Sequence, residues 1–149
     1  MVFAEIVPGK LYQSRAPFDV KELQKEYNIN VFVDLAGLSW FYKKELFAET
    51  KLLEFPIHDF SIPSRREFKQ FIKNLVEIYN QDNSIILIHC QGGRGRSTVC
   101  SACLYGVLHN LNGYEAINHI RKCVLFKVPE TEEQEYFIHR FIRKYHEED

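Results

Sequence analysis

The sequence predicts an α/β fold with a central, mostly parallel sheet of four or five strands and helices on both faces. Short β-branched and apolar runs of strand length alternate along the chain with segments whose apolar residues recur at helical spacing. One run, Ile85 to Ile88, is apolar throughout, as expected of a central strand that is covered on both faces. Ligands of such sheets bind beyond the carboxyl ends of the strands, so the functional site is expected there.

Capping residues and turn formers mark the expected element boundaries. A turn at Pro8 and Gly9 joins the first two strands, because proline presets φ and glycine permits a positive φ. Three candidate capping boxes pair Asp19 with Glu22, Ser64 with Glu67, and Thr131 with Gln134. The expected strands are 3–7, 11–14, 31–35, 52–57 and 84–89, and the expected helices are 19–27, 40–49, 64–79, 97–109, 114–123 and 132–146.

Length and composition bound the class of protein. The 149 residues are 46% hydrophobic and contain no linker or repeat, which predicts a single domain over 1–149 and a monomer. The net charge of -1 gives no overall electrostatic field that would mark the chain as a binder of nucleic acid or membranes. Neither a membrane-spanning segment nor a secretory leader is expected. The four cysteines are too few for a disulfide framework, so reduced thiols and a cytoplasmic location are predicted.

The most informative stretch follows the apolar strand and precedes a helix. It reads His89-Cys90-Gln91-Gly92-Gly93-Arg94-Gly95-Arg96-Ser97-Thr98. The glycines allow successive backbone N–H groups to point into one hollow, and the helix N-terminus adds its positive end. A phosphate-binding loop formed by residues 91 to 96 is therefore predicted. The NTPase phosphate loop does not fit, because Gly95 precedes arginine and no glycine stands five positions earlier.

Cys90 is the candidate nucleophile of this loop. The loop amides and Arg96 favour the ionised form of its sulfur, so a thiolate is expected at neutral pH. Arg96 follows after five residues and can grip two phosphate oxygens with its planar guanidinium. The Ser97 hydroxyl can stabilise the sulfur as a leaving group, and His89 can help to hold the loop.

With these residues the chain resembles the cysteine-dependent dual-specificity phosphatases of the protein tyrosine phosphatase superfamily, in particular the compact single-domain members. Their signature is His-Cys, five residues, Arg, then Ser or Thr, and residues 89–97 match every fixed position. The segment from Pro56 to Ser64 resembles the loop that carries the family's general acid, and Leu11 to Ser14, Ile120, Arg121 and Gln134 also look family-like.

The resemblance implies a fold, a reaction and further roles. The expected fold is that of the protein tyrosine phosphatases, and the expected reaction is hydrolysis of phosphoesters through a phosphocysteine. Asp59, which lies 31 residues before Cys90, would be the general acid and then the base. Gln134 is a candidate for orienting the attacking water. No metal or other cofactor is expected.

Several alternatives stay open at this stage. Asp59 could instead cap the helix near Ser64, and Asp34 is a rival acid that fits a structural role better. Cys100 and Cys103 fit buried core residues, although either could trap an oxidised Cys90. A phosphate-binding pseudoenzyme or a sulfurtransferase or arsenate-reductase type of cysteine enzyme remain as other classes.

One loop residue, Arg94, bears on the choice of substrate. Many members of the resembled family have an uncharged residue at the position of Arg94, whereas those acting on phosphoinositides or RNA 5′-triphosphates tend to have a basic one. Phosphotyrosine proteins, with phosphoserine and phosphothreonine proteins beside them, are the first expectation, and these polyanions are the second. The residues Trp40, Phe41 and Tyr42 could line the pocket lip or belong to an ordinary amphipathic helix.

Overall fold

A computed structural model of the chain describes residues 3–17 and 19–148. The predicted alternation of strands and helices is confirmed. The strands are β1 (Phe3–Val7), β2 (Leu11–Ser14), β3 (Val31–Asp34), β4 (Lys51–Glu54) and β5 (Ile86–His89); the helices are α1 (Val20–Tyr27), α2 (Arg65–Tyr79), α3 (Arg96–Leu108), α4 (Gly113–Val124) and α5 (Glu132–Glu148), with short 3-10 turns η1 (Ser39–Phe41) and η2 (Lys43–Glu45).

Within the described residues the strands form one five-stranded sheet in the order β1-β2-β5-β3-β4. β1 pairs antiparallel with β2, and every other neighbouring pair is parallel. The central strand β5 is the apolar run expected from the sequence, and all four of its residues are buried. Its last residue, His89, is in register with Ser14 of β2 and Asp34 of β3, so three strands end together beside Cys90.

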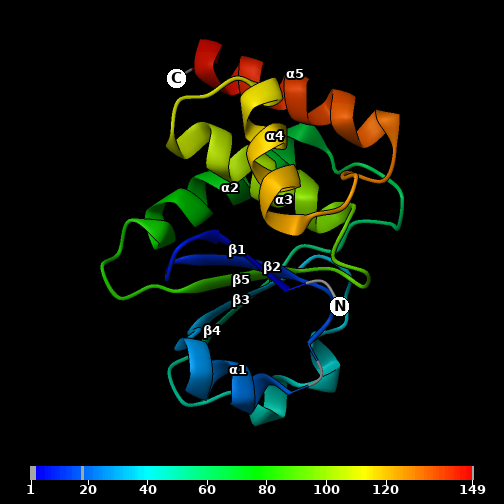
Figure 1. Ribbon diagram of the computed structural model, residues 1–149. Helices are drawn as coiled ribbons and strands as arrows, with labels where there is room; N and C mark the ends of the chain where they lie inside the picture. The colour runs from blue at the N-terminus through cyan, green and yellow to red at the C-terminus, as the bar shows by residue number, and fades with distance from the viewer. Residues whose placement is uncertain (1–2, 18, 149) are drawn as a thin grey trace.

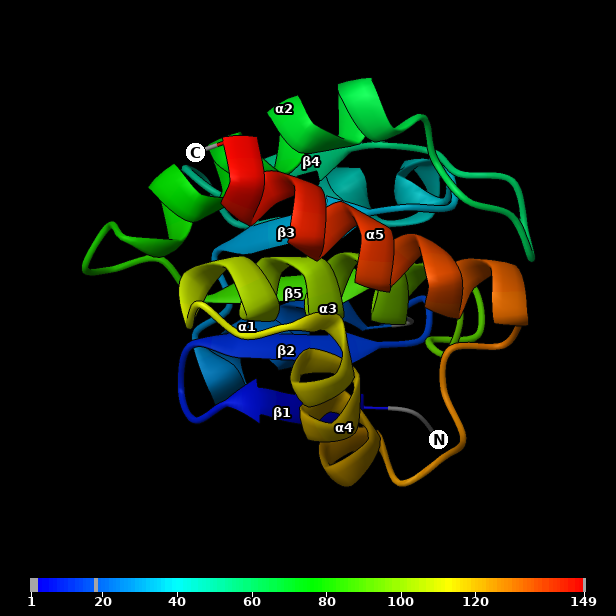
Figure 2. The same cartoon turned by 90° about the horizontal axis from the view of Figure 1, so that it is seen from above.

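Two layers of helices cover the sheet, as Figures 1 and 2 show. α2, α3, α4 and α5 lie on one face, and the buried side chains between them and the sheet form the larger core. α1 and the 3-10 turns lie on the other face over a smaller core that includes Phe32, Tyr42 and Leu87. The loops that follow β3, β4 and β5 all emerge at the right-hand end in both views. The fold thereby gathers distant segments at one end.

The helix predicted over 40–49 is wrong, since the segment forms only two 3-10 turns. The Asp34 carboxylate accepts hydrogen bonds from Ala36 N at 2.9 Å and Ser39 N at 2.6 Å, which fixes where the turn begins. The next backbone hydrogen bond has the i to i−3 spacing of a 3-10 turn, with Tyr42 N donating to Ser39 O. The Tyr42 side chain packs in the smaller core. A regular α-helix over this segment would not allow both the bonds to Asp34 and the burial of the Tyr42 side chain.

Two other local predictions need correction. The strand expected over 52–57 ends at Glu54, because Pro56 has no N–H; Phe55 N and Ile57 N still donate to the end of β3 at 2.9 Å. Ser64 does precede α2, but its side chain makes no capping bond. Asp19 does cap α1 by accepting from Glu22 N, and the capping box of Thr131 and Gln134 is confirmed, since the two residues bond reciprocally.

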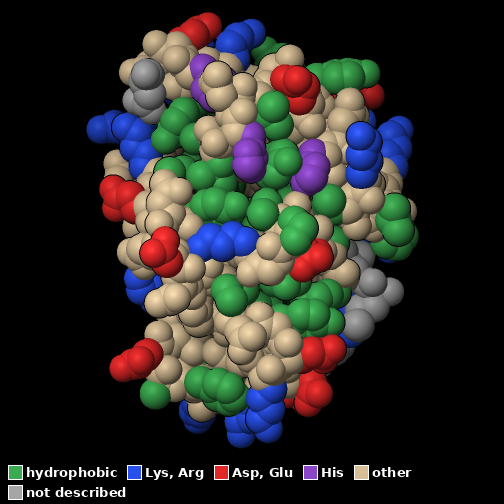
Figure 3. Space-filling model, turned by 60° about the vertical axis from the view of Figure 1, so that its left-hand side comes forward, with side chains coloured by type: hydrophobic (Ala, Val, Ile, Leu, Met, Phe, Trp, Pro, Cys, Tyr) green, Lys and Arg blue, Asp and Glu red, His purple; other side chains and the backbone are tan. Residues whose placement is uncertain are grey.

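Charged side chains of both signs are scattered over the surface in Figure 3, without a patch of a single sign on that face. This distribution agrees with the formal net charge of -1. Across residues 3–17 and 19–148, every helix is too short or too polar to cross a bilayer.

Candidate active site

The loop from Cys90 to Arg96 is held in place by β2 and by the two residues that follow this strand. Gln13, buried in β2, donates its Nε2 to Gly93 O at 3.0 Å and to Thr98 Oγ1 at 2.9 Å. Ala16 N donates to Gln91 O at 3.0 Å. Gly93 has φ +78°, and a Cβ there would lie 2.5 Å from Arg15 N. Glycine is therefore required at this position, by both its backbone conformation and its close approach to β2.

The Cys90 sulfur lies inside this loop. The side chain is 2% exposed, Gly93 N donates to Sγ at 3.2 Å, and the Ser97 hydroxyl lies 3.3 Å from Sγ. Both groups can hydrogen-bond a thiolate, and α3 begins at Arg96 with its N-terminus directed to the same end of the sheet. The structure therefore brings the predicted nucleophile, loop glycine and supporting serine together.

Arg96 joins the Cys90 loop to the segment after β4. Its guanidinium is buried, with Nη1 donating to Ile57 O at 2.8 Å and Nη2 at 3.4 Å from Asp59 Oδ1. Among the described residues the buried Nε–H of Arg96 has no hydrogen-bond partner. A buried cationic donor without a partner is costly, so a bound oxyanion would satisfy it. Arg96 is thus placed to hold an anion next to Cys90.

Asp59 lies in the loop between β4 and α2. Its side chain is 49% exposed, and its Oδ1 also accepts from Phe60 N at 3.0 Å. Phe60 has φ +61°, so the chain turns sharply after the aspartate. The bond to Arg96 sets the carboxylate beside the phosphate-binding arginine rather than at a helix cap, which is the arrangement that a proton donor to a bound phosphoester needs.

Gln134 connects the start of α5 to both loops. Its Oε1 accepts from Glu130 N at 3.0 Å and Thr131 N at 3.2 Å, while Nε2 donates to Ser61 O at 3.2 Å. A Cβ built on Gly95 would lie 3.1 Å from that Nε2. The side chain is fully buried. Gln134 therefore lies between the Cys90 loop and the Asp59 loop and holds the second of them.

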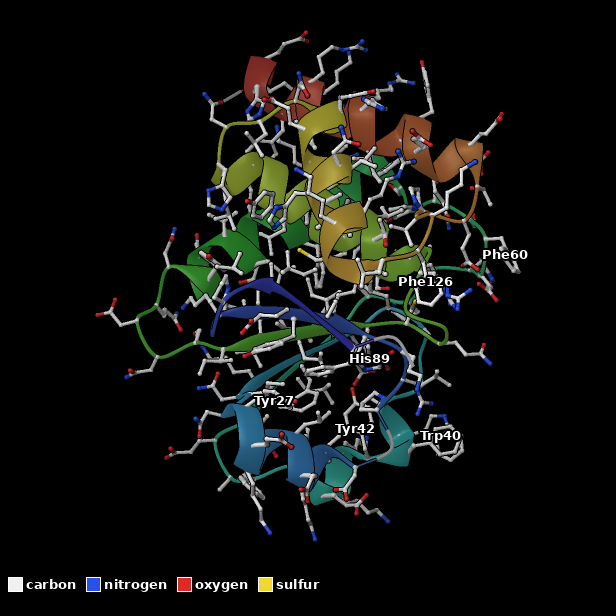
Figure 4. The ribbon with its side chains drawn as sticks, viewed as in Figure 1. Tyr27, Trp40, Tyr42, Phe60, His89 and Phe126 are labelled. Carbon is white, nitrogen blue, oxygen red and sulfur yellow. The ribbon has the colours of Figure 1, made fainter. Side chains whose placement is uncertain are left out.

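His89 supports the loop from the other face of the sheet. Its Nδ1 lies 3.3 Å from Cys90 O and its Nε2 2.6 Å from the Tyr42 hydroxyl. Because a carbonyl only accepts, Nδ1 carries the proton and Nε2 accepts from Tyr42 (Figure 4). Burial lowers the pKa of His89 against the opposing effects of Asp34 and the bond to the carbonyl, and burial raises the pKa of Tyr42. The pair is therefore held neutral.

The other residues considered from the sequence lie outside the group of contacts around Cys90, Arg96 and Asp59. Asp34 is buried and its carboxylate accepts from backbone amides, which is the structural role expected of it. Cys100 and Cys103 are fully buried in α3, and burial raises the pKa of both thiols. Arg94 lies over the Phe126 ring, with Cζ 3.9 Å from the centroid. No cluster of three metal-ligating side chains occurs in the part of the chain that the structure describes.

Comparison with known protein families decides the class. The family model described as "Polymorphic toxin system, DSP-PTPase phosphatase" matches residues 9–109, which include the whole Cys90 loop and the Asp59 segment. The chain belongs to the DSP-PTPase phosphatase family. The protein named "Putative tyrosine phosphatase 197R" of Invertebrate iridescent virus 6 is 30% identical over an alignment of 145 residues, and the match covers 88% of this chain and 52% of that protein. The chain spans little more than half of the curated relatives it matches, at 52% and 58% of their lengths.

Solved structures of DSP-PTPase type share the fold. PTPMT1 in complex with PI(5)P has a TM-score of 0.83 at 16% identity, with 99% of each chain covered. Tk-PTP in its active form has a TM-score of 0.78 at 24% identity, with 96% of this chain and 97% of that chain covered. At these identities the likeness concerns the fold, and the predicted protein tyrosine phosphatase-like architecture is confirmed.

Two supporting residues of this DSP-PTPase site were not assigned a role from the sequence. Gln13 fixes the Cys90 loop through Gly93 O, and Tyr42 fixes His89. Gln13 carried a signal, because it is a polar residue in a short strand that is otherwise buried against the central strand. Tyr42 was expected either at the pocket lip or in an ordinary amphipathic helix, and neither alternative predicts its buried bond to His89.

Proposed function

We propose that residues 1–149 are a catalytic domain that hydrolyses phosphomonoesters through a phosphocysteine, with phosphotyrosine proteins as the first substrate class. One observation supports this above the others: the buried Cys90 sulfur and the buried Nε–H of Arg96, which has no partner in residues 3–17 and 19–148, belong to one short loop. A tetrahedral dianion satisfies the arginine and places its phosphorus above the sulfur. The family membership agrees with this chemistry.

In the first step the Cys90 thiolate attacks phosphorus and the bond to the ester oxygen breaks. The loop amides and Arg96 stabilise the charge on the equatorial oxygens. Asp59, in its protonated form, donates a proton to the leaving oxygen, which departs as an alcohol or phenol. The product of this step is a phosphocysteine with Asp59 as a carboxylate.

In the second step water attacks the phosphocysteine and releases inorganic phosphate. Asp59 takes a proton from that water, and the sulfur leaves as a thiolate that the Ser97 hydroxyl, 3.3 Å away, stabilises by donating a hydrogen bond. Gln134 lies at the boundary of the two loops, where its amide can orient the water. The cycle needs no metal and no other cofactor.

A second substrate class is favoured by Arg94. Its guanidinium is held by the Phe126 ring at the edge of the phosphate loop, and it adds positive charge beside the pocket. Such a charge would favour a substrate with more than one phosphate, such as a phosphoinositide. A solved structure of the same fold, PTPMT1, is in complex with PI(5)P.

Cys90→Ser tests the proposal. Turnover of p-nitrophenyl phosphate is expected to be abolished, while inorganic phosphate still binds in a calorimetric titration, because Arg96 and the amides remain. Cys100→Ser, at a buried cysteine with a raised pKa, is the matched control and should retain turnover. Activity in Cys90→Ser would overturn the nucleophile assignment, and inactivity of the unmodified chain would indicate a pseudoenzyme.

A substrate panel then separates the two classes. Phosphotyrosyl and phosphoseryl peptides, soluble short-chain phosphoinositides and triphosphorylated RNA are compared by kcat/KM, with Arg94→Ala alongside. Preference for the phosphotyrosyl peptide, with little effect of Arg94→Ala, supports a protein substrate. A selective loss of phosphoinositide turnover in Arg94→Ala supports the second class.

A further inference from the structure

Large apolar side chains protrude from three separate loops around the mouth of the site. They come from η1, from the Asp59 loop and from the loop between α4 and α5, and each is between 40% and 82% exposed. We call them the apolar rim, which consists of Trp40, Phe41, Phe60, Leu125 and Phe126. Figure 4 shows Trp40, Phe60 and Phe126 at the same end of the molecule, with Trp40 and Phe60 pointing outward.

The η1 part of the rim, Trp40 and Phe41, is anchored in its exposed position. Ser39 and Tyr42, on either side of Trp40 and Phe41, are buried, and they are fixed by Asp34 and His89. Trp40 and Phe41 stack on each other, with centroids 3.8 Å apart, while both remain 64% exposed. The fold thus anchors the turn from below and leaves its two largest aromatic rings outside the core. Exposed apolar surface of this kind marks an interaction site.

Cations accompany two of the three loops. Lys43 and Lys44 follow the aromatic pair after one buried residue, Tyr42, and are exposed. Arg94 lies over Phe126, and Lys127 comes next in the chain. Acidic groups at this end include Asp59, which is paired with Arg96, and the exposed Glu45 and Glu130. Aromatic rings beside lysine and arginine match the chemistry of the interface of an anionic bilayer, where rings enter the headgroup layer and cations meet lipid phosphates.

We propose that the apolar rim docks the active-site end of this protein on an anionic lipid surface. Separate protruding tips suit a flat, deformable surface, whereas peptide recognition uses a groove or a sheet edge. Docking would be peripheral, with the rings in the headgroup layer and the Cys90 pocket facing the membrane. The proposal goes beyond phosphoester hydrolysis, because the surface acts whichever substrate the site takes.

Trp40 provides a direct probe, since it is the one tryptophan of the chain. Vesicles of phosphatidylcholine with phosphatidylserine should shift its emission to the blue, and brominated acyl chains should quench it. High salt should weaken the effect, because the contribution of the cations is screened. The proposal would be overturned if the vesicles neither shift the emission nor co-sediment with the protein. Equal binding to pure phosphatidylcholine vesicles would also overturn it, as would a shift caused by a soluble phosphopeptide and not by vesicles.

Matched variants locate the surface. Phe41→Ser combined with Leu125→Asn should lower vesicle binding about tenfold or more, because two apolar side chains are lost from the interface. Leu125 has φ +65°, which asparagine tolerates, so this variant should fold. Tyr114→Ser, at an equally exposed ring of α4, should bind as the unmodified chain does. The reverse order of effects would overturn the assignment. Turnover of soluble p-nitrophenyl phosphate, measured in parallel, separates loss of docking from loss of the active site.

Discussion

The Cys90 loop and the Asp59 loop supply the two halves of the proposed chemistry, but they are held very differently. The first is fixed by β2, β5 and α3, through backbone amides, Gln13 and a glycine packed against β2. The second is an irregular segment whose carboxylate is 49% exposed and whose position depends on Arg96 and Gln134. Cys90 is 2% exposed.

Because the two loops are held differently, changes in them should affect different properties of the protein. A change in the Cys90 loop disturbs backbone packing, so it should affect folding and phosphate binding together. A change in the Asp59 loop removes a few side-chain bonds at the surface, so it should affect the rate with little effect on folding.

Outside the Cys90 loop, Asp59→Asn should give the largest change in rate. Loss of the proton donor is expected to lower kcat by about 10²–10⁴ with little change in melting temperature. The loss should be greatest for substrates whose leaving group is a poor one, such as an alkyl alcohol, and smallest for p-nitrophenol. His58→Asn, at the exposed neighbour, is the control. An equal loss for all leaving groups would contradict the acid role.

Gly93→Ala tests the rigid half. An alanine Cβ would lie 2.5 Å from Arg15 N at a φ of +78°, so unfolding free energy should fall by about 2–3 kcal/mol and phosphate binding should weaken. At Gly92 nothing lies within 4 Å of the added Cβ. Gly92→Ala should therefore stay within about 0.5 kcal/mol in urea unfolding. Equal effects of the two variants would show that the loop is less constrained than its contacts with β2 indicate.

Gln134→Ala should have a smaller effect that reaches both halves. Losing the bond to Ser61 O should lower kcat about tenfold with a smaller change in KM, since the Asp59 loop is less well positioned. Helix α5 also loses part of its capping box, at about 1 kcal/mol. Thr131→Ala removes the other bond of that capping box and keeps the bond from Gln134 Nε2 to Ser61 O. If Thr131→Ala lowers kcat as much, the effect of Gln134 is one of helix stability.

The sequence predicted the Cys90 loop more fully than the Asp59 loop. The order of strands and helices, the apolar central strand and the Cys90 loop follow from local patterns, because strand, glycine turn and helix start agree there. The grouping of Cys90, Gly93, Arg96 and Ser97 could therefore be predicted residue by residue. Asp59 was placed by family resemblance, and its contact with Arg96 depends on a long-range tie through Ile57 O.

The failure at 40–49 has a clear physical cause. The segment has helical apolar spacing. However, the Asp34 carboxylate accepts a hydrogen bond from Ser39 N, and His89 Nε2 accepts one from the Tyr42 hydroxyl. Together these bonds outweigh the local helix preference. The same competition explains the exposed position of Trp40 and Phe41. The bond from Ser39 N to Asp34 spans only five residues, whereas the bond between Tyr42 and His89 joins residues 47 positions apart whose proximity depends on the finished sheet.

His89→Asn should give the smallest effect and tests the support beneath the rigid loop. Because burial lowers the pKa of His89 below its usual 6.5, the unfolded chain takes up a proton at this residue before the folded chain does. Unfolding free energy should therefore be fully retained above pH 6.5 and fall as the pH drops below it. In His89→Asn the curve should be flatter over that acid range, although lower at neutral pH because the bond to Tyr42 is altered. Urea unfolding at several pH values, with His58→Asn as the exposed control, would measure this, and an unchanged slope in His89→Asn would show that protonation of this residue does not limit the stability of the Cys90 loop.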